Sequence, residues 1–386
     1  MKVVHISMQG FLDGWGYQEN LLPEYMADAG HSVTVVSSAI HFPSYLKEEE
    51  RTNIIAKGLK YSLGKVQVRR IKNYIVTTQY SFIVSGLYKV LKEERPDVIF
   101  HHDVNSSSMM VSWVYCLFHK NVKFFIDNHA DEINQSPRKL WNLLVPKGLM
   151  RVCTKLIQRK VVKFYGVTPG RCDYLANIFG ASKAKISLLP IGGDTKATDA
   201  IFASKLELKE KYRIPKESIV LISGGKMGVD KGTVSLIKAY IDLKEKYNNL
   251  VLLLFGQFTD SETEELAKNT KGVYQEGWCD RIKTLELLKL ANVACWPIHH
   301  TTLIEDALAS SIPLVLRKTY NTSHSIKGNG VFVENGNFEE LILSIDSILR
   351  SYDVYKKEAM RMHDNYSYTN LVKQFENDCI YENSNS

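Results

Sequence analysis

Long apolar runs are missing from this 386-residue sequence. The longest mainly apolar stretches, Met109 to Phe118 and Leu250 to Phe255, are too short to cross the roughly 30 Å hydrocarbon core of a membrane as helices. The N-terminus also lacks the apolar region and small-residue cleavage site of a secretory signal, because Met1 and Lys2 lead directly into the strand-like Val3 to Ile6. We therefore expect no transmembrane span and a cytoplasmic location.

Cysteine is scarce, and its spacing argues against two kinds of site. The six cysteines contain no Cys-x-x-Cys pair, so neither a zinc cluster nor a disulfide framework is indicated. The neighbouring His299 and His300 do not suggest a metal site either, because adjacent side chains point apart and no third ligand is evident. No Asp-x-Asp sequence occurs, so a metal-clamped diphosphate has no evident ligands. We predict no metal ion and no cofactor.

An excess of negative charge is also absent. The formal net charge is +7, charged residues make up 24% and apolar residues 45%, which is the balance of a soluble globular protein. The positive charge suits diphosphates, acidic lipid or nucleic acid and does not distinguish among them. Because no nucleic-acid-binding module is recognisable and aromatic residues do not alternate with basic ones, we expect no nucleic acid partner.

The order of apolar runs predicts an α/β fold in two domains. Val3 to Ile6, a helical stretch from Glu19 to Ala29 and Val33 to Val36 form a βαβ unit, and the same alternation restarts at Ser218 to Ser223. A chain of this length exceeds what one core usually serves. We therefore predict two Rossmann-like domains, each a parallel sheet with helices on both faces. The predicted domains are residues 1–194 and 195–365.

One stretch, Lys147 to Lys163, places basic residues at four-residue spacing and apolar residues on the other side of a predicted helix. This pattern fits a solvated face on a helix that packs against the core. It also fits a patch that holds the protein against anionic membrane lipid. The basic residues of that patch are Lys147, Arg151, Lys155, Arg159 and Lys163.

Two glycine-rich segments precede predicted helices, where backbone N–H groups and the helix dipole can bind phosphate. In the first half, Gly14 to Gln18 fits this role, although a structural turn would look the same. The third glycine of a dinucleotide fingerprint is replaced there by Glu19, so the segment is a weak match to that motif. In the second half, Ser223 to Gly232 adds Lys226 and Lys231, which would neutralise a diphosphate unless they are merely solvated.

A carboxylate follows a later predicted strand. The segment Cys295 to Ala309 ends a strand and begins a helix, and Glu305 lies in the first turns of that helix. A carboxylate there can accept hydrogen bonds from the two hydroxyls of a ribose. A helix-capping acid would look the same, so the residue type and its place leave both roles open.

The order of these features resembles family 4 of the GT-B glycosyltransferases over nearly the whole chain. The first-half motifs are Gly16-Tyr17-Gln18-Glu19, Ala29 to Val33, Asn128-His129-Ala130 and Leu189 to Asp194. The second-half motifs are Gly225-Lys226, Asp230-Lys231-Gly232, Gly277-Trp278, Glu305 to Ser310 and Ile312-Pro313. The resemblance implies the GT-B fold, with the two domains facing across a cleft and a C-terminal helix, about residues 366–386, returning to the N-terminal domain.

The resemblance also implies roles for single residues. The expected donor-binding residues are Gly16, Gly225, Lys226, Lys231, Gly277 and Glu305, and the expected catalytic residues are His129, Lys226 and Lys231. In these roles the lysines lie at the diphosphate, Glu305 lies at the ribose, and His129 approaches the transferred sugar. On the acceptor side we expect Trp15, Tyr17 and Asp131.

One motif departs from the family. The family has two glutamates separated by seven residues, but here Pro297 stands eight residues before Glu305 and no glutamate replaces the first one. His299 or His300 is expected to occupy the vacated space, and the expected sugar contacts are His299, His300, Thr301 and Thr302. The loss motivates one alternative, a non-catalytic GT-B subunit that supports a partner enzyme. A second alternative is a nucleotide-sugar epimerase on the same fold.

The activity implied by the resemblance is retaining hexosyl transfer. The expected donor is a nucleotide diphosphate sugar, with UDP favoured over GDP, and the expected acceptor is a cell-surface polysaccharide or a lipid-linked glycan, as in capsule or lipopolysaccharide synthesis. Lysines and a helix dipole would replace a metal in stabilising the leaving diphosphate. No protein nucleophile is evident, so a donor phosphate oxygen would take the acceptor proton. The enzyme would then work at the inner face of the cell membrane.

Overall fold

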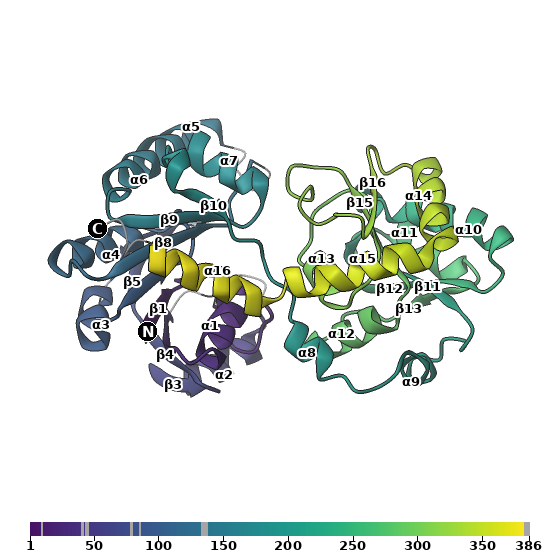
Figure 1. The fold of residues 1–386 in the computed structure, drawn as a ribbon, viewed down its shortest axis with the longest axis horizontal. Coiled ribbons are helices and arrows are strands. Elements are labelled where there is room, and N and C mark those ends of the chain that lie inside the picture. The colour runs from purple at the N-terminus through teal and green to yellow at the C-terminus, as the bar shows by residue number, and fades with distance from the viewer. Residues whose placement is uncertain are drawn as a thin grey trace. The chain divides into compact units, whose positions relative to one another are not determined.

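The computed structural model describes residues 1–8, 11–39, 42, 46–77, 80–84, 86–132 and 138–381. The chain forms two compact units, Met1–Pro190 together with Leu371–Ser386, and Ile191–Asn370. Each unit is an α/β structure built on a largely parallel sheet, which confirms the predicted fold class (Figure 1). The last part of the expected C-terminal helix, residues 382–386, lies outside the described residues.

The first unit contains an eight-stranded sheet in the order β10-β9-β8-β7-β1-β2-β4-β3. Its strands are β1 (Lys2–Ile6), β2 (Ser32–Ser38), β3 (Lys60–Leu63), β4 (Val66–Ile71), β7 (Val98–His101), β8 (Lys123–Asn128), β9 (Val161–Gly166) and β10 (Ile186–Leu188). All neighbours run parallel except β3 and β4, which form an antiparallel pair at the edge. A separate antiparallel pair consists of β5 (Asn73–Thr77) and β6 (Tyr80–Val84).

The helices of the first unit connect these strands. They are α1 (Gln18–Asp28), α2 (Glu48–Ala56), α3 (Leu87–Glu94), α4 (Ser108–Phe118), α5 (Lys139–Leu144), a π-helical turn (Val145–Met150), α6 (Arg151–Ile157), α7 (Pro169–Asn177), a 3-10 turn (Lys183–Lys185) and α16 (Tyr368–Tyr381). Parallel strands must be covered on both faces, and the central strands here are accordingly mainly apolar and mostly buried. The sheet therefore forms a rigid base for the polar residues at its strand ends.

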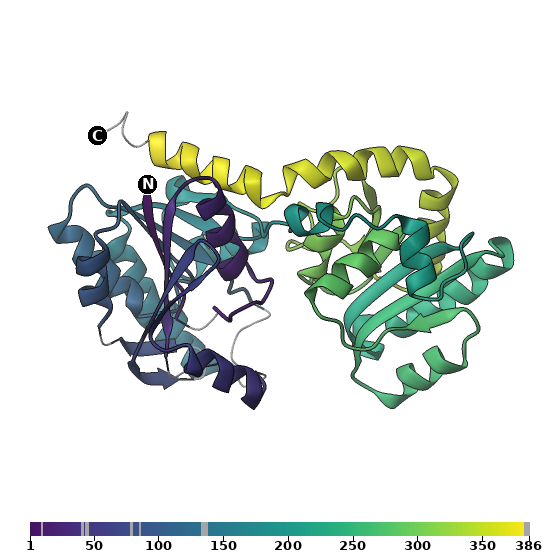
Figure 2. The ribbon, with the colours of Figure 1, turned by 90° about the horizontal axis from the view of Figure 1, so that it is seen from below.

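The C-terminal helix α16 belongs to the packing of the first unit (Figure 2). Its Phe375 ring lies 5.8 Å from the ring of Phe100 and 4.9 Å from that of Phe125. Its Asp378 accepts hydrogen bonds from Lys163 Nζ at 2.5 Å and Tyr165 Oη at 2.7 Å. The helix is thus held by both apolar and charged contacts to the sheet.

The predicted helix from Lys147 to Lys163 is wrong in its extent. The helical part ends with α6 at Ile157, and the chain then enters β9 at Val161, so Lys163 lies in the sheet and pairs with Asp378. The β-branched pair at the start of β9 favours a strand and is buried there, which overrides the four-residue spacing of the charges. Lys163 is therefore removed from the predicted basic patch.

The second unit contains a six-stranded, fully parallel sheet in the order β13-β12-β11-β14-β15-β16. Its strands are β11 (Ile219–Met227), β12 (Leu250–Phe258), β13 (Val273–Gln275), β14 (Val293–Trp296), β15 (Leu314–Arg317) and β16 (Gly330–Val333). Its helices are α8 (Thr195–Asp199), α9 (Lys205–Lys211), a 3-10 turn (Val229–Lys231), α10 (Thr233–Lys246), α11 (Ser261–Asn269), α12 (Arg281–Leu290), α13 (Leu303–Ala309), α14 (Phe338–Arg350) and α15 (Tyr352–Asn365).

The core of the second unit lies on both faces of this sheet. One cluster packs strand residues such as Ile222 and Leu253 against α13, and the other packs Leu221 and Leu252 against α10. The alternation of the two sets along β11 and β12 is the two-residue period of a strand buried on both sides. Among the described helices of the whole chain, none is long and apolar enough to cross a membrane.

Candidate active site

The carboxyl ends of β7 and β8 bring two imidazoles to one carboxylate in the first unit. Asp127 is fully buried, and its Oδ2 lies 2.7 Å from His102 Nδ1 and 3.3 Å from His129 Nε2. His5 on β1 contacts the other ring nitrogen of His102, with a 3.0 Å separation between His5 Nδ1 and His102 Nε2. Because β1, β7 and β8 are neighbours in the sheet, their residues meet although they are far apart in sequence.

The charges of this cluster follow from burial and proximity. Burial alone would raise the pKa of Asp127, but the attraction of His102 and His129 outweighs it and holds that pKa far below its usual range. Burial would lower the pKa of His129, yet Asp127 raises it to about 9. His129 is therefore an imidazolium at neutral pH. The pKa of His5 is lowered by burial and by His102, so His5 is neutral.

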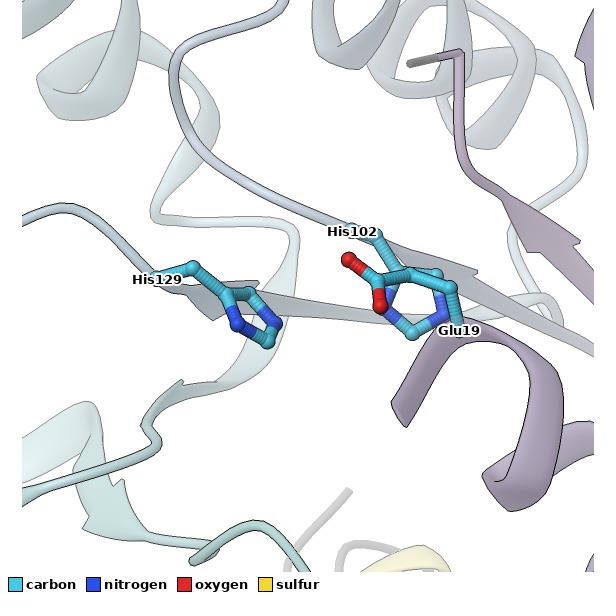
Figure 3. Close-up of side chains that lie close together, drawn as sticks. All are labelled: Glu19, His102 and His129. Carbon is cyan, nitrogen blue, oxygen red and sulfur yellow. The ribbon is translucent and has the colours of Figure 1, made fainter. Parts of the chain in front are cut away.

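Glu19, in the first turn of α1, approaches the same cluster (Figure 3). One ligand atom from each of Glu19, His102 and His129 can be chosen so that all three lie within 4.8 Å of one another. The sequence analysis identified His129 but assigned no role to Asp127, His102 or Glu19. The signal for Asp127 was present, because residues two apart at a strand end point to the same side of a sheet.

The glycine loop before α1 is shaped by Gly14 more than by Gly16. Gly14 has a φ of +77°, a conformation that favours glycine, and Gly16 precedes the start of α1 at Gln18. The rings of Trp15 and Tyr17 lie 5.3 Å apart at an angle of 41°. These two aromatic residues, expected on the acceptor side, therefore form one paired surface on this loop.

Asp131, also expected on the acceptor side, lies just beyond the histidine cluster. Its side chain is largely buried, and its Oδ2 is 3.4 Å from Arg171 Nε on α7. Asn128, between Asp127 and His129, donates to the backbone oxygens of Ala130 and Arg171. These contacts fix the backbone that carries His129 and orient its ring.

In the second unit, the predicted phosphate segment runs from the end of β11 to the start of α10. Gly225 and Gly232 have φ values of +98° and +75°, and Thr233 Oγ1 accepts a hydrogen bond from the Gly228 backbone at 3.1 Å. Lys226 is exposed, while Lys231 is half-buried and pairs with Asp230 at 3.0 Å. The segment thus presents backbone N–H groups, a helix N-terminus and two ammonium groups in one stretch of chain.

Glu305, in the first turn of α13, is a buried carboxylate with one oxygen still available. Its Oε1 lies 2.9 Å from His300 Nε2. Its Oε2 is buried and has no hydrogen-bond partner within the part of the chain that the structure describes. Burial would raise the pKa of Glu305, but His300 and His324 lower it, so the group is ionised. An ionised oxygen in this state is suited to accept a hydroxyl hydrogen bond.

The segment that carries Glu305 packs against the phosphate segment. A Cβ atom on Gly225 would lie 3.4 Å from Leu303, and one on Gly232 would lie 2.8 Å from both Pro297 and Ile298. Both glycines therefore allow the chain before α13 to approach the loop closely. The two predicted donor elements of the second unit form one continuous surface.

The four residues expected to contact the sugar differ in their exposure and in their hydrogen-bond partners. His300 is turned to Glu305, whereas His299 is exposed and its pKa is lowered by partial burial and by Lys231. Thr301 Oγ1 accepts from the backbone of Leu303 at 3.4 Å, and Thr302 is exposed. Of the two histidines considered for the space of the lost glutamate, His299 is the one that lies near Lys231.

The expected donor residue Gly277 lies after β13. It has a φ of +57°, and its carbonyl oxygen accepts a hydrogen bond from the Gly256 backbone at 2.6 Å. Trp278, which follows it, is 71% exposed. Gly277 therefore pairs the segment after β13 with β12, and the residue after it presents a large aromatic side chain to solvent.

The sequence of the second unit matches a known family. Residues 204–367 match the model of the glycosyl transferases group 1. This segment is a glycosyltransferase domain of that group. A search of curated proteins returned no significant match to the sequence.

Solved structures establish that this glycosyltransferase has the GT-B fold. A glycosyltransferase from Rickettsia africae ESF-5 has a TM-score of 0.68 at 15% identity, with 98% of this chain and 97% of that chain covered. Anabaena Alr3699/HepE in complex with UDP has a TM-score of 0.68 at 14% identity, covering 98% and 99%. The UDP-GlcNAc 2-epimerase from Neisseria meningitidis has a TM-score of 0.62 at 13% identity, covering 99% and 100%.

Proposed function

We propose that this glycosyltransferase transfers a sugar, with retention of anomeric configuration, from a UDP-sugar to a polysaccharide or lipid-linked glycan. The observation that carries the donor assignment is the buried Glu305 carboxylate, which keeps Oε2 without a partner in the described chain and adjoins the glycine and lysine segment. A ribose hydroxyl would satisfy that oxygen, and the diphosphate would follow at Gly225 to Gly232. UDP is favoured because a structural neighbour contains it.

In this proposal two lysines, and not a metal ion, stabilise the leaving diphosphate. Lys226 and Lys231 neutralise charge on the diphosphate as the bond to the sugar loosens, with the N-terminus of α10 adding its dipole. The His129 imidazolium, held by Asp127, donates a hydrogen bond to the transferred sugar. A phosphate oxygen of the donor takes the acceptor proton, so no protein nucleophile is used.

The first experiment measures thermal stabilisation by a panel of nucleoside diphosphates and their sugars. A ligand that binds only the folded state raises the melting temperature, so one nucleotide should give a clear shift. Lys226→Ala should reduce that shift, whereas Lys216→Ala, an exposed lysine of the same unit, should leave it unchanged. Absence of a shift with every nucleotide would contradict the donor site and favour a non-catalytic subunit.

A second experiment separates transfer from epimerisation. Incubation with the stabilising nucleotide sugar and no acceptor should leave the donor sugar unchanged, since the proposed reaction needs an acceptor hydroxyl. A separate reaction contains an acceptor and a chelator. Nuclear magnetic resonance of its product should show the same anomeric configuration as the donor. Conversion of free donor into its epimer would replace transfer as the assigned reaction.

We also propose that the first unit binds the surface of an anionic membrane through the segment α5 to α6. Six apolar side chains of this segment are between 46% and 67% exposed, namely Leu140, Leu143, Leu144, Leu149, Val152 and Leu156. Lys147, Lys155 and Arg159 are exposed beside them in sequence. Exposed leucines together with basic residues are typical of segments that lie in the lipid interface.

Arg151 makes a different contact within this segment. Its guanidinium donates to two backbone oxygens at the end of α7, at 2.7 and 2.9 Å, so it is excluded from the membrane proposal.

Vesicle sedimentation tests this surface. Replacing Lys147, Lys155 and Arg159 by glutamate should weaken binding to anionic vesicles by ~100-fold or more, since each basic residue contributes about 1 kcal/mol. The same charge reversal at Lys216, Lys271 and Lys318, which are exposed in the second unit, should have little effect. Equal losses in the two variants would show that only net charge matters and would remove the assignment to α5 and α6.

A further inference from the structure

Three side chains from separate elements converge in the first unit in a way the sequence did not predict. Glu19 comes from the start of α1, His102 follows β7, and His129 follows β8 (Figure 3). Their candidate ligand atoms lie within 4.8 Å of one another. Zinc bonds of about 2.0–2.2 Å place tetrahedral ligands roughly 3.3 Å apart, so modest side-chain rotations would close the set around an ion.

The donor set has the chemistry of a transition-metal site. Two imidazole nitrogens and one carboxylate suit zinc and its neighbours better than magnesium or calcium, which prefer oxygen ligands. His129 has a side-chain exposure of 24%, whereas that of His102 is 2%, so an ion could enter from the His129 side and meet a fixed ligand.

The position of Asp127 is a second observation in favour of a metal ion at this cluster. Its Oδ2 is the atom toward which both imidazoles already point, at 2.7 and 3.3 Å, and its side chain is completely buried. Metal-binding histidines are commonly oriented by a carboxylate, which also raises their basicity. The carboxylates of Glu19 and Asp127 together match the charge of a divalent cation. An ion would replace imidazole protons and keep the carboxylate beside it.

We propose that Glu19, His102 and His129 bind a divalent transition-metal ion of the zinc class, with Asp127 as its adjacent carboxylate. The site differs from the lysine and helix site proposed for the diphosphate and is not needed for transfer. Closing the ligand set around a bound ion rotates the His129 ring toward the cluster and away from the sugar. Occupancy therefore inhibits transfer, a consequence that rests on the proposed role of His129.

Titration of the chelator-treated full chain with Zn²⁺ or Co²⁺ tests the site without any nucleotide sugar. We expect one ion per chain by calorimetry and the intense visible bands of four-coordinate Co²⁺. Glu19→Gln and His129→Gln should each weaken binding at least ~10-fold, and His363→Gln, a histidine of the second unit, should not. Melting curves of the variants in the absence of metal establish that they fold.

Two results would overturn the proposal. Failure of the chain to bind either ion would mean that the cluster is only a hydrogen-bonded network around Asp127. Binding that is equally tight in Glu19→Gln and in the unchanged chain would place the ion elsewhere. His102 is not varied because it is buried between His5 and Asp127, where a substitution endangers the fold.

Inhibition by Zn²⁺ is measured separately from binding. Transfer by the unchanged enzyme should fall over the same concentration range as binding, and Glu19→Gln should resist inhibition. Full transfer at saturating Zn²⁺ would overturn the inhibitory role. A failure of nucleotide binding would instead contradict the proposed donor site, and it would be detected by the thermal shift experiment in metal-free solution.

Discussion

The two units differ in how deeply the charged residues of their candidate sites are buried. In the first, the carboxylate of Asp127 is buried and two histidines are fixed around it at the ends of sheet strands. In the second, Lys226 at the end of β11 and Lys231 in the following 3-10 turn are exposed or half-buried, and Glu305 is buried. Buried charge is held in one geometry and is costly to disturb, whereas exposed lysines adapt to a ligand at little cost. The first arrangement suits orientation of a reacting group, and the second suits capture of a mobile diphosphate.

The largest expected effect comes from removing the buried charge of the first unit. Asp127→Asn should lower the rate of transfer by ~100-fold or more, because His129 loses the anion that orients it and stabilises its protonated form. Affinity for the nucleoside diphosphate, which we assign to the second unit, should stay unchanged. Steady-state kinetics and calorimetry measure the two quantities. A turnover within threefold of the unchanged enzyme would mean that Asp127 is only structural.

Removal of the half-buried Lys231 charge in the second unit should lower the affinity for the diphosphate. Lys231→Ala should weaken diphosphate binding by ~10- to 100-fold, since hydrogen bonds to charged groups contribute about 1.5–3 kcal/mol. Lys231→Arg should restore much of the affinity, because it keeps the positive charge at this position. Calorimetry with the diphosphate decides this, and normal affinity in the alanine variant would exclude Lys231 from the site.

A smaller effect should distinguish the two oxygens of Glu305. Glu305→Gln should lower the affinity for the ribonucleotide by ~10-fold. The affinity for deoxyribose analogues should be the same in this variant as in the unchanged enzyme. His300→Ala should instead affect stability first, because it leaves a buried carboxylate without its hydrogen-bond partner. If His300→Ala lost discrimination between ribose and deoxyribose and Glu305→Gln kept it, His300 and not Glu305 would be the residue that binds the ribose.

The smallest effect concerns pH. The folded-state pKa of Glu305 is lowered from its ordinary value of 4.5, so its stabilising contribution is present above that value and is lost as the pH falls through the folded-state value. Hydrogen exchange in α13 should therefore speed up as the pH is taken below about 4.5, after correction for intrinsic rates. In Glu305→Gln this extra dependence should disappear. An identical profile in both proteins would show that His300 does not stabilise the ionised carboxylate.

Local sequence patterns predicted most of the second unit. The run from Ser218 to Ser223 indicated the start of β11, the apolar run from Leu250 to Phe255 coincides with β12, and the strand expected before Glu305 is β14, whereas β16 was not predicted. Gly330 lies at the start of β16, where its missing side chain leaves room for the Leu314 carbonyl, and a glycine gives no apolar signal.

The edge of the first sheet was harder to predict. The strands β3 to β6 were not predicted, and they pair as antiparallel neighbours. Edge pairs are short and partly exposed, as the alternating burial of β3 shows, so they lack the continuous apolar runs of central strands. The misplaced end of the Lys147 to Lys163 helix has a related cause, because charge spacing is a weaker signal than burial of Val161 and Val162.

The sequence by itself determined the local chemistry of this protein, namely two runs of parallel strands, a glycine and lysine segment before a helix, His129 after β8 and Glu305 at the start of α13. These features depend on residues close together in the chain, where periodicity and turn chemistry act directly. Only the tertiary structure decided that Glu19, His102 and His129 meet at Asp127 and that His300 faces Glu305. The physical reason is the strand order: β1, β7 and β8 become neighbours through crossover connections, and no local pattern records which distant side chains such a sheet brings together.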